Sequence, residues 1–206
     1  PEEVHQIMDG CFKILMDEIH RYEGTINQFT GDGVMALFGA PVAHEEHARM
    51  ACQAAVATQR AMGEYEEKIG KEYGVAFKMR MGLNSGLVVV GSIGDDLRMD
   101  YTAVGDTTNL ASRMESHAQP GHILVSGHTY AHSKAYFEFE ALGRLAIKGK
   151  EAPQEAYELV RAGGVETRIG ASVARGLTKF VGRTREQEAL KEACEKAGSG
   201  GGQVVG

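Results

Sequence analysis

The sequence predicts an α+β fold of the ferredoxin-like kind, in which helices cover one face of a mostly antiparallel sheet. Two observations support this fold class. Apolar residues recur at helical spacing in residues 3–22, 45–71 and 105–117. Short segments with strand-like patterns lie between these helices, mostly in pairs. Helices that alternate with strand pairs are typical of this architecture.

The first helix, residues 3–22, is amphipathic and ends before Gly24. Residues 25–41, TINQFTGDGVMALFGAP, then predict two short strands closed by a tight turn at Gly31-Asp32-Gly33. Glycine tolerates the positive φ that hairpin turns require. The Asp32 carboxylate at the hairpin tip has two interpretations. It is either a turn former or a ligand that holds a divalent cation beside a nucleotide phosphate.

Two helices and several short strands are predicted after the hairpin. The second helix, residues 45–71, carries small residues that suit close packing. The third helix begins at Gly105-Asp106-Thr107, with Asp or Thr as its N-cap, and ends near His117. Asn84-Ser85-Gly86 is interpreted as a turn. Strands are predicted at residues 77–83, 87–90, 99–104, 123–125, 137–140, 145–147 and 156–160, and the apolar run at 87–90 predicts a buried strand.

Asn109 and Arg113 on the third helix are four residues apart and therefore share one face. In isolation they would be interpreted as solvated polar residues. An amide and a guanidinium on one face can also hold a ribose and a phosphoryl group, because the planar fork of arginine matches phosphate oxygens.

The composition excludes several classes of protein. The 206 residues are 43% hydrophobic and 24% charged, which is sufficient for a globular core. The net charge of −6, with acids and bases mixed, argues against nucleic acid or an anionic membrane as the main partner. No apolar run is long enough for a membrane span and no signal peptide is visible. The odd number of cysteines (Cys11, Cys52 and Cys194) favours reduced thiols and a cytoplasmic location.

Four segments occur in the order that resembles the catalytic domain of class III adenylate and guanylate cyclases: FTGDGVMALFGAP, GLNSGLVVVGSIG, YTAVGDTTNLASRMES and IKGK. The resemblance covers residues 1–161. It implies conversion of ATP into 3′,5′-cyclic AMP and pyrophosphate, by attack of the 3′-hydroxyl on the α-phosphorus. It also implies two assisting metal ions, Mg²⁺ or Mn²⁺, and a head-to-tail homodimer with each active site built from both partners.

The resemblance implies a role for each candidate residue. Asp32 matches the second of two metal-binding aspartates. Asn109 resembles the asparagine that positions the ribose, and Arg113 the arginine that stabilises charge developing at the α-phosphate. Lys148 resembles the lysine that meets the β- and γ-phosphates. These roles agree with a reaction that needs alignment and positive charge more than covalent chemistry.

Gln28 and Thr102 bear on the choice of purine. Adenylate-forming members commonly have a lysine where this chain has Gln28, and an aspartate, or in one large subgroup a threonine, where it has Thr102. The threonine favours ATP. A glutamine amide both donates and accepts, so it can face either purine, and guanylate cyclase activity remains the alternative.

The family's first strand, with the first metal aspartate, would lie before Pro1. We therefore expect residues 1–206 alone to cyclise ATP weakly or not at all. The other alternative is a degenerate, non-catalytic cyclase-like module that dimerises to regulate an attached ATPase.

The C-terminal residues predict a separate unit. Residues 162–179 are glycine-rich with few large apolar side chains and are expected to form a linker. Residues 180–206 resemble the truncated start of an AAA-like or STAND-type ATPase domain, with a strand, a helix, a glycine-rich loop and a second strand. The GxxxxGK[ST] phosphate loop is absent from the sequence.

Overall fold

The computed structural model of the chain describes residues 2–93, 100–147, 149, 152–164 and 183–198, and for residues 89–93, 100–104, 184 and 187 it describes the backbone alone. The chain divides into two units, residues 1–171 and 172–206. In the second unit the described residues form one helix, α6 (Thr184–Gly198). Both strands expected around it, and most of the expected linker, lie outside the described residues. The predicted domain boundaries therefore stay predictions.

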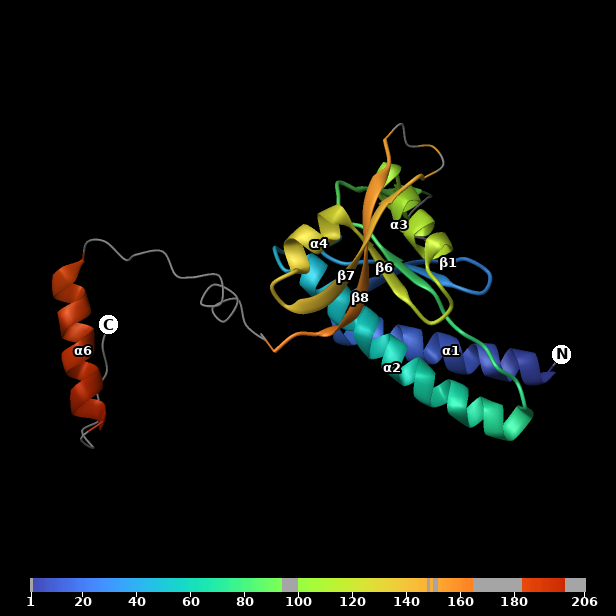
Figure 1. Cartoon of the computed structure of the whole chain (residues 1–206), viewed down its shortest axis with the longest axis horizontal. Coiled ribbons are helices and arrows are strands. Elements are labelled where there is room, and N and C mark those ends of the chain that lie inside the picture. The colour runs from blue at the N-terminus through green and yellow to red at the C-terminus, as the bar shows by residue number, and fades with distance from the viewer. Residues whose placement is uncertain (1, 94–99, 148, 150–151, 165–182, 199–206) are drawn as a thin grey trace. The chain divides into compact units, whose positions relative to one another are not determined.

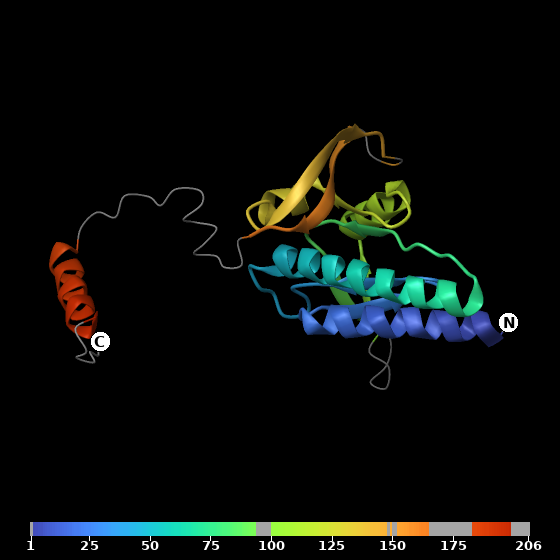
Figure 2. The same cartoon turned by 60° about the horizontal axis from the view of Figure 1, so that its bottom comes forward.

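Two long antiparallel helices, α1 (Glu2–Arg21) and α2 (His47–Tyr73), lie side by side in the first unit (Figures 1 and 2). They pack over the hairpin of β1 (Thr25–Phe29) and β2 (Val34–Leu37). Their shared core contains Ile7, Leu15 and Ile19 of α1 and Met62 and Ile69 of α2. Each such side chain contributes about 1.5–3 kcal/mol when fully buried.

A four-stranded sheet forms the centre of the unit, in the order β3 (Met81–Leu83), β6 (Ile123–Ser126), β8 (Gln154–Ala162) and β7 (Phe137–Leu145). β3 and β6 are parallel, and the other two pairs are antiparallel. A separate antiparallel pair is formed by β4 (Val89–Ile93) and β5 (Asp100–Val104).

Helices cover both faces of the four-stranded sheet. On one face, α3 (Asp106–His117) packs through Leu110 and Met114 against Leu124 and Ala156. On the other face, α2 and the short helix α4 (Gly127–Ser133) lie over the strands, and Cys52 packs among their inward side chains. All three cysteines are free, and burial raises the pKa of the Cys52 thiol to about 12.

The α+β fold class, with helices packed on a largely antiparallel sheet, is confirmed, although the strands are distributed over three sheets in the described part of the chain. The expectation that helices cover one face alone is wrong, because α2 and α4 pack on the face opposite α3. The three long helices expected from the apolar periodicity are present, with ends within two residues of their predicted bounds. No helix in the described ranges is long and apolar enough to cross a membrane.

Several local predictions are wrong. Leu87 is 97% exposed, so the predicted buried strand begins later, at Val89. Residues 77–80 are not in a strand, and residues 137–145 form one strand instead of two pieces. The helix α4 was not predicted; it begins after Ser126, whose side chain accepts a hydrogen bond from the Thr129 N–H. Helix α3 begins after Gly105 at φ +151°, a conformation that favours glycine, and no side chain caps it.

A helix and a strand approach each other closely at Gly82. A Cβ atom there would collide with the α3 backbone at Ala111 O and Glu115 N, and would lie 2.7 Å from Glu115 Cα. A methyl group has no room unless the helix moves. Gly63 on α2 is the opposite case, because nothing lies within 4 Å of a Cβ built there.

We therefore expect Gly82→Ala to lower the free energy of unfolding by about 1–3 kcal/mol, the usual cost of overpacking. The matched variant Gly63→Ala should raise it by about 0.5–1 kcal/mol, because alanine is the better helix former. Urea unfolding of the two variants and the wild type measures both effects. Equal stability of the two variants would contradict the tight contact at Gly82.

Candidate active site

Asp32 lies in a short, well-defined turn. The Thr30 N–H donates to Gly33 O at 2.8 Å, and Gly31 adopts a φ of +74°. The glycine with positive φ is thus the one before Asp32. The Asp32 side chain is exposed at the end of the β1–β2 hairpin. Its carboxylate is therefore available to a ligand in solution.

Asn109 and Arg113 lie on the outer side of α3. Leu110 is 6% exposed and Met114 is fully buried, and these two residues fix the inner face of the helix. The neighbouring positions Asn109 and Arg113 are exposed. Both residues lie on one helix, four positions apart, so they share one face of it as expected.

Gln28 and Thr102 come from strands that lie against each other, β1 and β5. Gln28 is exposed and pairs with Met35 just after an irregularity in the β1–β2 register. Thr102 pairs with Gly91, and the structure describes only the backbone of Thr102. The structure therefore brings together the two strands expected to meet the base. Lys148 lies outside the described residues.

The hairpin and α3 belong to different layers of the unit. No hydrogen bond or ion pair in the described part of the chain joins the Asp32 carboxylate to Asn109 or Arg113. One chain thus presents two separate functional groups, a carboxylate on a hairpin and an amide–guanidinium pair on a helix.

A network of side-chain hydrogen bonds at the beginning of α3 was not predicted from the sequence. Asn84 Nδ2 donates to Thr107 O at 2.9 Å, and Asn84 Oδ1 accepts from Ser126 Oγ at 2.6 Å. Thr107 Oγ1 donates to Leu87 O at 2.6 Å. The sequence signal at Asn84-Ser85-Gly86 indicated only a turn, because partners so far apart along the chain leave no local pattern.

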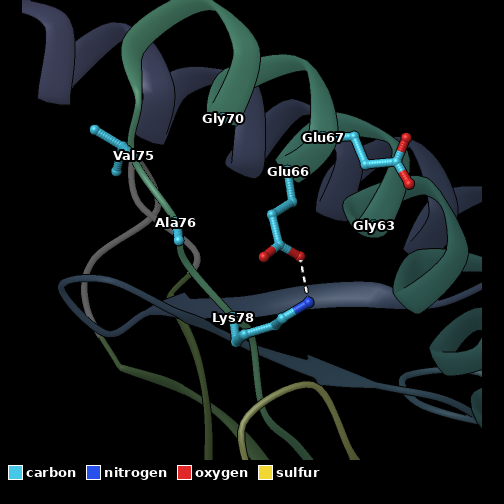
Figure 3. A pocket seen from close by; sticks show the side chains of 7 residues that line it. All are labelled: Gly63, Glu66, Glu67, Gly70, Val75, Ala76 and Lys78. Atoms are coloured by element: carbon cyan, nitrogen blue, oxygen red, sulfur yellow. Dashed lines mark hydrogen bonds and ion pairs between the residues drawn. The ribbon is translucent and has the colours of Figure 1, made fainter.

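One hollow on the surface of the first unit contains none of the predicted site residues. It lies between the last turns of α2 and the segment that follows them, and Figure 3 shows Lys78 directed toward Glu66 across it. The two side chains form an ion pair of 2.6 Å. With its lysine already paired to a carboxylate, this hollow is poorly suited to a nucleotide triphosphate.

The donor set for a metal is incomplete in the described residues. They contain no group of three or more His, Cys, Asp or Glu side chains arranged to hold a metal ion. Mg²⁺, however, is usually bound by one or two carboxylates together with substrate phosphates and water. Asp32 is exposed and has no ion-pair partner among the described residues, so it fits that role as a single ligand.

The comparisons with known proteins decide the family. The family model described as the adenylate and guanylate cyclase catalytic domain matches residues 1–161 of this chain. The chain belongs to this family. Adenylate cyclase 1 of Rhizobium meliloti is 36% identical to it over 162 residues, which are 78% of this chain and 24% of that protein. The cyclase domain thus spans about a quarter of the length of that curated relative.

Solved structures of cyclases superpose on this chain, in agreement with the family match. The adenylyl cyclase CyaB from P. aeruginosa superposes on the cyclase domain with a TM-score of 0.73 at 32% identity, over 78% of this chain and 83% of that one. The guanylyl cyclase Cya2 superposes with a TM-score of 0.73 at 31% identity, over 80% and 83%. Neighbours of both nucleotide specificities therefore share this fold equally well.

Because Asn109 and Arg113 are exposed and outside the packed face of α3, their truncation should not affect folding. We expect Asn109→Ala and Arg113→Ala to change the free energy of unfolding by less than about 0.5 kcal/mol. Urea unfolding tests this. A loss of more than about 2 kcal/mol in either variant would show that the side chain supports the fold.

Proposed function

We propose that the cyclase domain converts ATP into 3′,5′-cyclic AMP and pyrophosphate. The observation that carries this proposal is the exposed Asn109–Arg113 pair on α3, within a domain of the cyclase family that also presents the exposed carboxylate of Asp32. In the reaction the 3′-oxygen forms a bond to the α-phosphorus and loses its proton, while the bond from that phosphorus to the pyrophosphate oxygen breaks.

Each group has a separate task in the proposed mechanism. The Asn109 amide orients the ribose so that its 3′-oxygen faces the α-phosphate, and the Arg113 guanidinium stabilises the negative charge that grows there. Asp32 holds Mg²⁺ or Mn²⁺, which neutralises phosphate charge when bound. Lys148 binds the β- and γ-phosphates as a point charge.

We also propose that the site is completed in a head-to-tail homodimer. Asp32 is not joined to Asn109 or Arg113 within one chain, and all three side chains face solvent. Two copies related by a two-fold axis would present the hairpin of one copy to α3 of the other, and would form two identical sites. The free cysteines suit a cytoplasmic location for the enzyme.

The choice of nucleotide depends on Gln28 and Thr102. Thr102 favours ATP, and the similarity to Adenylate cyclase 1 of Rhizobium meliloti supports that choice. GTP is the second candidate, because the Gln28 amide can face either purine and the guanylyl cyclase Cya2 is an equally good structural neighbour. A regulatory, non-catalytic role beside an ATPase unit begun by residues 180–206 is the remaining alternative.

The direct test measures cyclic AMP and cyclic GMP formed from ATP and GTP, with Mg²⁺ and with Mn²⁺. It compares the 206-residue chain with a longer protein in which a strand carrying the aspartate expected from the resemblance is placed before Pro1. We expect cyclic AMP from the longer protein and little product from residues 1–206. Arg113→Ala in the longer protein should lower turnover by about 10²–10³-fold, as does the loss of comparable transition-state donors.

Arg60→Ala is the matched control for Arg113→Ala. Arg60 is another helical, exposed arginine, on α2. Its removal should leave turnover within about threefold, because substitutions at the surface away from the site have small effects. An unchanged rate in Arg113→Ala would remove the role assigned to this residue, and a longer protein without product from either nucleotide would favour the non-catalytic alternative.

The shared site predicts complementation between two inactive variants. Asp32→Asn and Arg113→Ala proteins, each inactive alone, should recover about a quarter of the wild-type rate when mixed in equal amounts. About half of randomly paired dimers are mixed, and each has one intact site of two. Activity is measured after the subunits have exchanged. A mixture no more active than its components would contradict a site shared between copies.

A further inference from the structure

We propose that Asn84 is a positioning residue for the cyclase reaction, which holds α3 so that Asn109 and Arg113 face the nucleotide. The inference rests on the proposed function and adds to it a residue that touches neither substrate nor metal. Its basis is the pair of hydrogen bonds that the Asn84 amide makes to α3 and to the end of β6.

Asn84 joins three elements through one side chain. It follows the last residue of β3, its Nδ2 donates to Thr107 O in the first turn of α3, and its Oδ1 accepts from Ser126 Oγ at the end of β6. Both the N–H group and the oxygen of the amide are therefore hydrogen-bonded. Ser126 is 3% exposed, so its hydroxyl group needs a partner inside the protein.

The bond to Thr107 lies close to the proposed catalytic groups. Asn109 is two residues and Arg113 six residues further along α3, which is about 9 Å along the axis from Thr107 to Arg113. Asn109 and Arg113 are exposed and obtain little support from packing of their own. Their positions therefore follow from the position of the helix, and a shift of its first turn displaces both.

Two further contacts of α3 lie nearer its middle than its first turn. Gly82 sets the distance between β3 and the middle of the helix, at Ala111 and Glu115. Arg80 pairs with Glu115 at 3.3 Å, but both side chains are well exposed, so this pair is weak. At the N-terminal end of α3, the N-cap residue Gly105 has no side chain that could cap the helix. The Asn84 amide and the Thr107 hydroxyl group, which donates to Leu87 O, hold this end of the helix.

Asn84→Asp tests the inference. An aspartate can still accept from Ser126 Oγ, but it has no N–H to donate to Thr107 O and places a second oxygen against it. Gln59→Glu is the matched control, since Gln59 Nε2 also donates to a backbone carbonyl, Gly121 O, at 2.6 Å, but this carbonyl follows the C-terminal end of α3 and is away from its first turn. Each variant replaces one amide donor by a carboxylate oxygen of the same size.

Two readouts are needed, in the form of the protein that shows cyclase activity. Asn84→Asp should lower kcat about 10–100-fold, with KM for ATP within about threefold, because a misplacement near 1 Å costs about this much in the transition state. Gln59→Glu should leave kcat within about threefold. Amide hydrogen exchange should accelerate in residues 105–112 of Asn84→Asp and stay at the wild-type rate there in Gln59→Glu.

The outcomes separate this inference from the proposed function. A wild-type kcat in Asn84→Asp, or an equal loss in Gln59→Glu, would overturn the positioning role. Unchanged exchange in residues 105–112 would overturn it too, and this readout does not depend on activity. If the wild-type protein forms no cyclic nucleotide, the proposed function fails on its own, and the exchange measurement still decides whether Asn84 holds the helix.

Discussion

The contact between α3 and β3 determines where the proposed catalytic groups lie. Gly82 allows the helix backbone to approach the strand so closely that no side chain fits between them. Leu110 and Met114 then bury the inner face of the helix, and Met114 is fully inaccessible. Because protein interiors are close-packed, this arrangement admits very little movement of the middle of the helix. The outward direction of Asn109 and Arg113 is a consequence of this contact.

The described candidate side chains all face solvent, whereas the elements that carry them are packed. Asp32 is on a hairpin that packs on α1 and α2, and the Asn109–Arg113 pair is on a helix that packs on the four-stranded sheet. Rigid elements suit a reaction that depends on alignment, because precise positions persist without support from the substrate. Exposure on separate elements is also the reason why we propose a site shared between two copies.

The accuracy of the sequence-based predictions followed the range of the interactions involved. The helices α1, α2 and α3 have strong apolar periodicity, which is local and was interpreted correctly. Leu87 was predicted in a buried strand because it precedes three valines, but the strand begins two residues later and Leu87 is exposed. The short helix α4 was missed since its seven residues include two histidines, a serine and a glycine, a weak helical signal.

From the sequence alone, the residue types and their spacing determined the candidate groups: a carboxylate between glycines at a hairpin tip, and an amide and a guanidinium one helical turn apart. These features are local, so a linear pattern contains them. Only the tertiary structure revealed that Asn84 bridges the first turn of α3 and Ser126, 42 residues further along the chain. Hydrogen bonds between residues so distant depend on how the strands and helices pack, and no periodicity in the sequence encodes that packing.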